Sequence, residues 1–180
     1  MRSICVMALS LAIGFSFMAK AEDIKSGPTE KIAGAFNVKA FTGEKKGDEL
    51  CYVCKFGGEA RPAVVLIFTQ KADDNLVKLV KSIDEVQKSN SKLGTVVVGV
   101  GGVEGADLEK LQSEHKLTTA LTVASDKDGP KAYKLNKEAV VTVLVYKKGG
   151  TITKNFAFAS TKDAAAMSKE IAEAAKTALE

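Results

Sequence analysis

From residue 63 onward, wholly apolar segments alternate with segments of helical periodicity, and this alternation constrains the fold more than any other feature of the chain. The apolar run 63–68 is typical of a strand that is covered on both faces, and 95–100, apolar after Thr95, is likewise predicted as a buried strand. Between them, apolar side chains recur at helical spacing from Leu76 to Val86, which predicts an amphipathic helix. Strands and helices that alternate in this way indicate parallel strands joined by right-handed crossovers.

The pattern continues to the end of the chain. A two-glycine turn at 147–150 separates two β-rich runs, which predicts a hairpin with antiparallel strands at one edge of the sheet. Ser160 and Asp163 form a capping box that opens a final helix. The elements predicted after the second strand are a helix at 106–116, a strand at 119–124, a short helical piece ending at Tyr133, strands at 140–146 and 151–158, and the final helix. We therefore expect an α/β fold with a mixed central sheet and flanking helices.

The segment before residue 63 predicts a β extension of the same domain. Residues 22–34 are polar with Gly and Pro and indicate a lead-in tail. Residues 36–41 alternate apolar and polar side chains as a half-buried strand does, and 42–48 is turn-like. Residues 49–56, which contain two cysteines, are predicted as a second strand. One domain spanning 35–180 is long enough to enclose a single packed core.

The first 21 residues have the layout of a secretory signal peptide. Arg2 gives a positive start, 4–17 is apolar, and Ala19-Lys20-Ala21 is a small-x-small cleavage site. Cleavage after Ala21 predicts a periplasmic or secreted bacterial protein with no membrane association after processing. An uncleaved anchor is the alternative, although the apolar run is shorter than the roughly 20 residues that span a bilayer.

Charge and arginine content argue against a nucleic-acid partner. Loss of Arg2 and Lys20 with the leader lowers the formal net charge of +4 by two. The lysines alternate with acidic residues along the chain, and Arg61 is the one arginine outside the leader. We expect a solvated surface of mixed charge and no nucleic-acid partner.

The pair Cys51-Tyr-Val-Cys54 is the one motif that carries chemistry, since Cys5 lies within the leader. A C-x-x-C pair suits thiol–disulfide exchange, because one thiolate attacks a substrate disulfide and the second resolves the intermediate. In a regular strand the two cysteines would be about 10 Å apart, so a bond between them requires a turn or helical bend. Tyr52 and Val53 favour extended backbone. A redox-active pair, a structural disulfide and two unpaired thiols all remain open, and Lys55 could support a thiolate or be an ordinary solvated lysine.

The second half of the chain resembles the thioredoxin-like superfamily. Gly129–Leu135 is similar to the family's short helix ending in a tyrosine, and Val140–Gly150 to the terminal hairpin that follows it. The two N-terminal strands resemble the extension of peroxiredoxin-like and exported thioredoxin-like proteins. The resemblance covers about residues 35–180. It implies a thioredoxin-like fold and thiol–disulfide chemistry of Cys51 and Cys54 with a protein thiol or disulfide partner.

The sequence departs from that family at two places. In thioredoxins the dithiol follows the central strand and opens the next helix, whereas here it precedes that strand. The matching loop, 69–74, contains no cysteine, and Val141 stands where the family has a cis proline. These departures favour a second hypothesis, a non-catalytic binding module in which Cys51 and Cys54 form a structural disulfide or stay unpaired. Whether the chain is an enzyme stays open at this point.

Other cofactor and metal sites are not expected. Cys51, Cys54 and His115 are too few ligands for a zinc site, and His115 lies on the apolar stripe of its predicted helix. The glycine-rich segment 99–105 follows a strand, but Glu104 occupies the place of the third glycine of a dinucleotide-binding loop. We interpret it as a tight turn between strand and helix.

Overall fold

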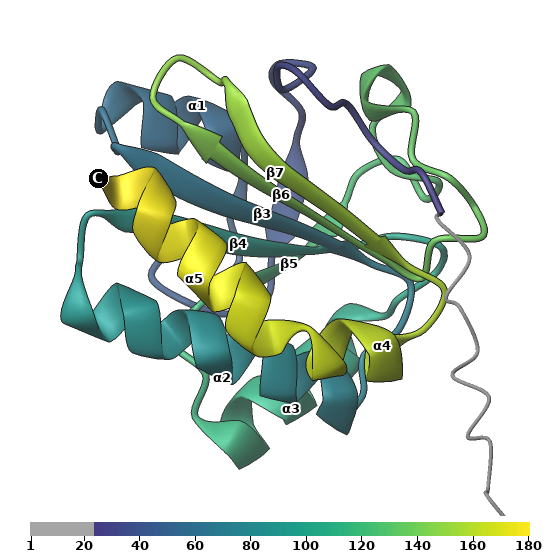
Figure 1. The fold of residues 1–180 in the computed structure, drawn as a ribbon. Helices are drawn as coiled ribbons and strands as arrows, with labels where there is room; N and C mark the ends of the chain where they lie inside the picture. Colours follow the sequence, from purple (N-terminus) through teal and green to yellow (C-terminus); the bar gives the residue numbers. More distant parts are fainter. Residues whose placement is uncertain (1–23) are drawn as a thin grey trace, which may run out of the picture.

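The computed structural model describes residues 24–180, so the predicted signal peptide lies outside the described residues. Seven strands form one mixed sheet in the order β2-β1-β5-β4-β3-β6-β7 (Figure 1). The strands are β1 (Val38–Ala40), β2 (Glu49–Leu50), β3 (Ala63–Thr69), β4 (Leu93–Gly99), β5 (Ala120–Ala124), β6 (Val141–Lys147) and β7 (Ile152–Phe158). The helices are α1 (Tyr52–Gly58), α2 (Asp74–Ser89), α3 (Gly105–His115), the 3₁₀ helix η1 (Lys131–Tyr133), α4 (Thr161–Ala166) and α5 (Ser168–Leu179).

The central strands have the predicted parallel arrangement. β3 pairs with β4 in parallel from Ala63 and Leu93 to Thr69 and Gly99, and β4 pairs in parallel with β5. β6 is antiparallel to β3, and β7 is antiparallel to β6. Every residue of β3 and β4 is buried, because layers of chain cover both faces of the sheet. This explains the unbroken apolar runs in the sequence.

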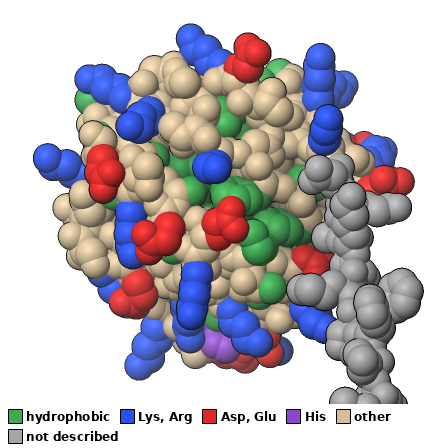
Figure 2. All heavy atoms as spheres, viewed as in Figure 1, with side chains coloured by type: hydrophobic (Ala, Val, Ile, Leu, Met, Phe, Trp, Pro, Cys, Tyr) green, Lys and Arg blue, Asp and Glu red, His purple; other side chains and the backbone are tan. Residues whose placement is uncertain are grey.

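The long helices cover one face of the sheet. α2 and α5 cross this face beside each other, and α3 and α4 lie at the same side (Figure 1). Leu79, Ile83 and Ile171 belong to the core cluster beneath them. The carboxylate of Asp73 caps α2 by accepting the N–H groups of Asn75 and Leu76, both at 3.0 Å. Lysines and acidic side chains are interspersed over this face (Figure 2).

The opposite face is covered by α1, η1 and the segment before β1. Ser26 is buried, and its hydroxyl oxygen accepts hydrogen bonds from the Asn136 N–H at 3.0 Å and the Thr142 hydroxyl at 2.7 Å. The ring of Phe36 packs against Phe68 and Tyr133, with centroids 5.7 and 5.1 Å away. The described part of the predicted tail, residues 24–34, therefore packs against the domain.

The predicted strand at 49–56 is confirmed only for Glu49–Leu50 and is wrong beyond them. β2 ends at Leu50, and a helix begins at Tyr52. Tyr52 and Phe56 lie four residues apart, so a helix turns both rings toward the sheet, where both are buried with centroids 5.6 Å apart. Burial of such a side chain stabilises the fold by about 1.5–3 kcal/mol, which outweighs β-propensities that differ by about 1 kcal/mol in all.

The predicted final helix is divided in two. α4 begins after Ser160, whose hydroxyl accepts the Asp163 N–H at 3.2 Å as the capping box predicted. The chain bends at Met167, which ends α4 and precedes α5. Among residues 24–180, none of the helices has the length and hydropathy needed to cross a bilayer.

Candidate functional site

Cys51 and Cys54 form a disulfide at the start of α1, and their Cα atoms are 5.2 Å apart. The helical bend that the bond requires is supplied by α1, since Cys51 is its N-cap residue and Cys54 lies in its first turn. The structure thus brings together the two residues that the sequence singled out, although by a helix that the sequence did not predict.

The two sulfur-bearing side chains differ in environment. Cys51 is half-buried, whereas Cys54 is exposed. The Sγ atom of Cys51 accepts a hydrogen bond from the backbone N–H of Cys54 at 3.1 Å. A bonded N–H stabilises sulfur as its negative charge develops, so this contact favours the thiolate of Cys51 after the disulfide opens.

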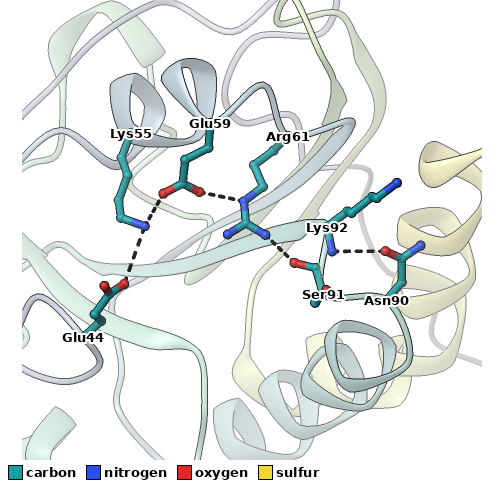
Figure 3. A network of polar contacts seen from close by, with 7 residues as sticks. All are labelled: Glu44, Lys55, Glu59, Arg61, Asn90, Ser91 and Lys92. Atoms are coloured by element: carbon teal, nitrogen blue, oxygen red, sulfur yellow. Dashed lines mark hydrogen bonds and ion pairs between the residues drawn. The ribbon is translucent and has the colours of Figure 1, made fainter.

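Lys55, the candidate for thiolate support, is part of an ion-pair network instead (Figure 3). Its Nζ lies 2.6 Å from Glu59 Oε1 and 3.9 Å from Glu44 Oε2. Glu59 also accepts a hydrogen bond from Arg61 Nε at 2.7 Å, and the Arg61 guanidinium donates to the Ser91 carbonyl. The ammonium of Lys55 is therefore paired with carboxylates, which weakens its support for a cysteine thiolate.

The network changes the protonation of Glu59. The hydrogen bond from Lys55, followed by the one from Arg61, lowers the pKa of the Glu59 carboxyl. Burial raises the pKa of Tyr52, and the carboxylates of Glu44 and Asp48 raise it further. The Tyr52 phenol, next to Cys51 in sequence, therefore stays neutral at physiological pH, and the Glu59 carboxylate stays ionised.

α1 ends near the amino ends of the central strands. The ring of Phe56 packs over Gly94 at the start of β4, where an added Cβ would lie 3.0 Å from the ring. Arg61 joins the end of α1 to Ser91, in the turn between α2 and β4. The loop 69–74 leaves the carboxyl end of β3 instead. The last turn of α1 and the loop 69–74 thus lie at opposite ends of β3.

Comparison with known proteins identifies the fold. No protein-family model and no curated protein matches the sequence. A putative thiol:disulfide interchange protein DsbE from Chlorobium tepidum is 13% identical with a TM-score of 0.61, over 87% of this chain and 99% of that one. Peroxiredoxin Q from Xanthomonas campestris, in a mutant form, is 12% identical with a TM-score of 0.62, over 87% and 100%. A putative protein disulfide isomerase from Bacteroides thetaiotaomicron is 15% identical with a TM-score of 0.60, over 85% and 95%.

The chain has a thioredoxin-like fold. This confirms the predicted fold class, including the mixed sheet and its flanking helices. At the loop where thioredoxins carry their dithiol, this thioredoxin-like chain has Gln70, whose amide donates to the carbonyls of Lys137 and Ala139 at 3.0 and 2.9 Å. All peptide bonds of the described residues are trans, including that of Val141. Both departures noted in the sequence are therefore present in the structure.

His115 and the glycine-rich segment 99–105 were the other residues considered for a metal or cofactor site. His115 is the last residue of α3, and its Nε2 lies 3.4 Å from Asp74 Oδ1. Within residues 24–180, no three His, Cys, Asp or Glu side chains are grouped so as to hold a metal ion. The segment 99–105 is the expected tight turn, with Gly101 and Gly102 at φ +68° and +98°.

Proposed function

We propose that this chain is an exported thiol–disulfide exchange protein that works through Cys51 and Cys54. The observation that carries the proposal is a C-x-x-C disulfide whose second cysteine is exposed. A disulfide with an exposed cysteine can be attacked by the thiolate of another protein, which is the first step of exchange. The partner class is a protein thiol or disulfide.

The size of the disulfide loop supports a redox role over a structural one. The bond joins residues three apart in sequence. A loop this small removes little conformational entropy from the unfolded chain, about 2 kcal/mol in the loop-entropy model, against about 4.7 for a 100-residue loop. The names of two structural neighbours, a thiol:disulfide interchange protein and a protein disulfide isomerase, support the same chemistry.

Export rests on the leader. Residues 1–21 lie outside the described residues, and the signal-peptide pattern in the sequence supports the proposal. A periplasmic or secreted location is also the setting in which a disulfide persists. Expression of the full chain in a bacterium, with mass determination of the periplasmic product, tests this directly: a chain that begins at Glu22 supports export, and an intact Met1 in the cytosol contradicts it.

The second candidate is a non-catalytic binding module with a structural disulfide. It is favoured by the cysteine-free loop 69–74 and by Val141 in the place of the family's cis proline. On this account the chain binds a partner without exchanging electrons with it.

Insulin reduction separates the two candidates. The processed protein, regenerated by glutathione, is expected to reduce insulin disulfides, and Cys51→Ser and Cys54→Ser are each expected to abolish turnover. Lys55→Gln is the control, since its charge is offset by Glu59 and Glu44 and turnover should stay within about twofold. Wild-type protein without activity above buffer, combined with lost stability in Cys51→Ser, would support the binding module.

A further inference from the structure

We propose that Cys54 is the cysteine that forms the mixed disulfide with the partner and that Cys51 is the resolving cysteine. This inference rests on the proposed function and assigns the roles within it. Cys54 is exposed, whereas Cys51 is half-buried at the junction of β2 and α1. An in-line attack on a disulfide needs access to one sulfur, and the more exposed residue is the more accessible of the two.

Cys51 is suited to be the leaving thiolate when a partner attacks Cys54. A partner thiolate attacks Sγ of Cys54, the new S–S bond joins the partner to Cys54, and the Cys51–Cys54 bond breaks with its electron pair on Cys51. The Cys54 N–H, 3.1 Å from Cys51 Sγ, is in place to stabilise the departing thiolate. A second partner thiolate then attacks the partner sulfur and releases Cys54, so that the partner is oxidised to a disulfide and this chain is reduced to a dithiol. The reverse sequence reduces a partner disulfide.

The surface beside Cys54 is bare backbone. Gly57 and Gly58 lie three and four residues after Cys54, on the same side of α1, and both are exposed. A Cβ added at either glycine would meet nothing within 4 Å, and neither glycine has a positive φ. Glycine in a helix costs about 0.5–1 kcal/mol relative to alanine. The fold therefore gains nothing from these two glycines.

Ala60, by contrast, occupies a position where glycine would be more stable. Ala60, just beyond the helix, has φ +52°, a conformation that glycine adopts without strain. Residues that lower local stability without improving the packing, such as these exposed helical glycines, are expected at functional positions. The bare surface lets the backbone of an extended, cysteine-containing polypeptide approach the sulfur of Cys54, which is the partner that this geometry fits.

Single-cysteine variants test the roles. Cys51→Ser keeps only Cys54, Cys54→Ser keeps only Cys51, and both lack the disulfide, so each is the other's control. Both are reduced, checked by circular dichroism and mixed with oxidised glutathione, and adduct formation is followed by mass spectrometry. The Cys51→Ser variant is expected to form the adduct at least tenfold faster. Equal rates, or faster reaction of Cys54→Ser, would overturn the assignment.

This outcome is separate from the outcome for the proposed function. A wild-type protein that reduces insulin while Cys54→Ser reacts faster retains the function and loses the assigned roles. A wild-type protein without insulin-reducing activity loses the function, whatever the rates of the single-cysteine variants.

Variants of Gly57 test the partner surface. Gly57→Leu adds a side chain beside Cys54, and Gly57→Ala adds only a methyl group that meets open space. With reduced, unfolded ribonuclease A as the thiol probe, Gly57→Leu is expected to slow oxidation of the probe at least threefold, while Gly57→Ala stays within twofold. With glutathione both variants should react as the wild type does. Equal ribonuclease rates for the two variants would overturn the docking surface.

Discussion

Ala60 is held in a left-handed conformation directly after α1, with φ +52°. For a residue with a Cβ this backbone conformation costs about 1–2 kcal/mol, and glycine is free of that cost. We expect Ala60→Gly to raise the free energy of unfolding by up to about 1 kcal/mol, because the greater freedom of glycine in the unfolded chain offsets part of the gain. Urea denaturation measures the change, and a loss of stability would show that the strain assigned to Ala60 is absent.

Glu59 makes the stability of the fold depend on pH. Lys55 and Arg61 lower its pKa from the ordinary value of 4.5. A lowered pKa in the folded state gives stability that is complete above 4.5 and is lost as the pH falls through the lowered value. The stability difference between the wild type and Glu59→Gln should therefore be present at pH 7 and shrink below pH 4.5. A difference that stays constant down to acid unfolding would contradict the ion-pair network.

At the scale of elements, Asp84 joins α2 to the start of β5. It is buried, and its carboxylate accepts the N–H groups of Thr118 and Thr119 at 2.9 and 3.1 Å and the Thr119 hydroxyl at 2.6 Å. Asp84→Ala leaves these donors without their acceptor and should lower the free energy of unfolding by at least about 2 kcal/mol. The neighbouring Glu85→Gln, which breaks only an exposed pair with Lys88, should change it by less than about 1 kcal/mol. Similar effects of the two substitutions in urea denaturation would rule out the anchor.

The junction of α3 with the N-terminal strands depends on Gly105. A Cβ there would overlap the ring of Phe41. We expect Gly105→Ala to lower stability by about 1–3 kcal/mol through overpacking. Gly57→Ala, whose Cβ meets open space, should instead raise it by about 0.5–1 kcal/mol. The opposite signs, measured by thermal denaturation, check the packing of Phe41, and equal signs would contradict it.

Most elements could be predicted from the sequence because their pattern reflects burial directly. β3 and β4 are apolar apart from Thr69 and Thr95, since both faces are covered. Asp73 caps α2, as acidic residues before a helix often do. α1 could not be predicted in this way. Tyr52 and Val53 have strand propensity, and the helix forms because Tyr52 and Phe56 find a site on the sheet. The four-residue spacing of those two aromatic residues fits one face of a helix and one face of a strand alike, so it does not decide between the two.

At the scale of the whole molecule, the sequence was enough to single out Cys51 and Cys54 as the candidate redox residues, but it left open whether they are bonded to each other. It could not predict which cysteine is the more exposed, because that depends on which side of α1 faces the sheet. The exposed glycines beside Cys54 were missed for the same reason. Their position beside Cys54 follows from the orientation of α1, which buries Tyr52 and exposes Gly57.

The proposed function depends on a Cys51–Cys54 disulfide that is redox-active although it lies outside the loop 69–74. Titration of the processed protein in glutathione redox buffers, with thiols counted by mass spectrometry, tests it most directly. We expect Cys51 and Cys54 to interconvert between disulfide and dithiol at a potential above about −300 mV, in the range of exchange proteins. A pair that stays oxidised until well below about −300 mV, or that never forms a disulfide, would contradict the account.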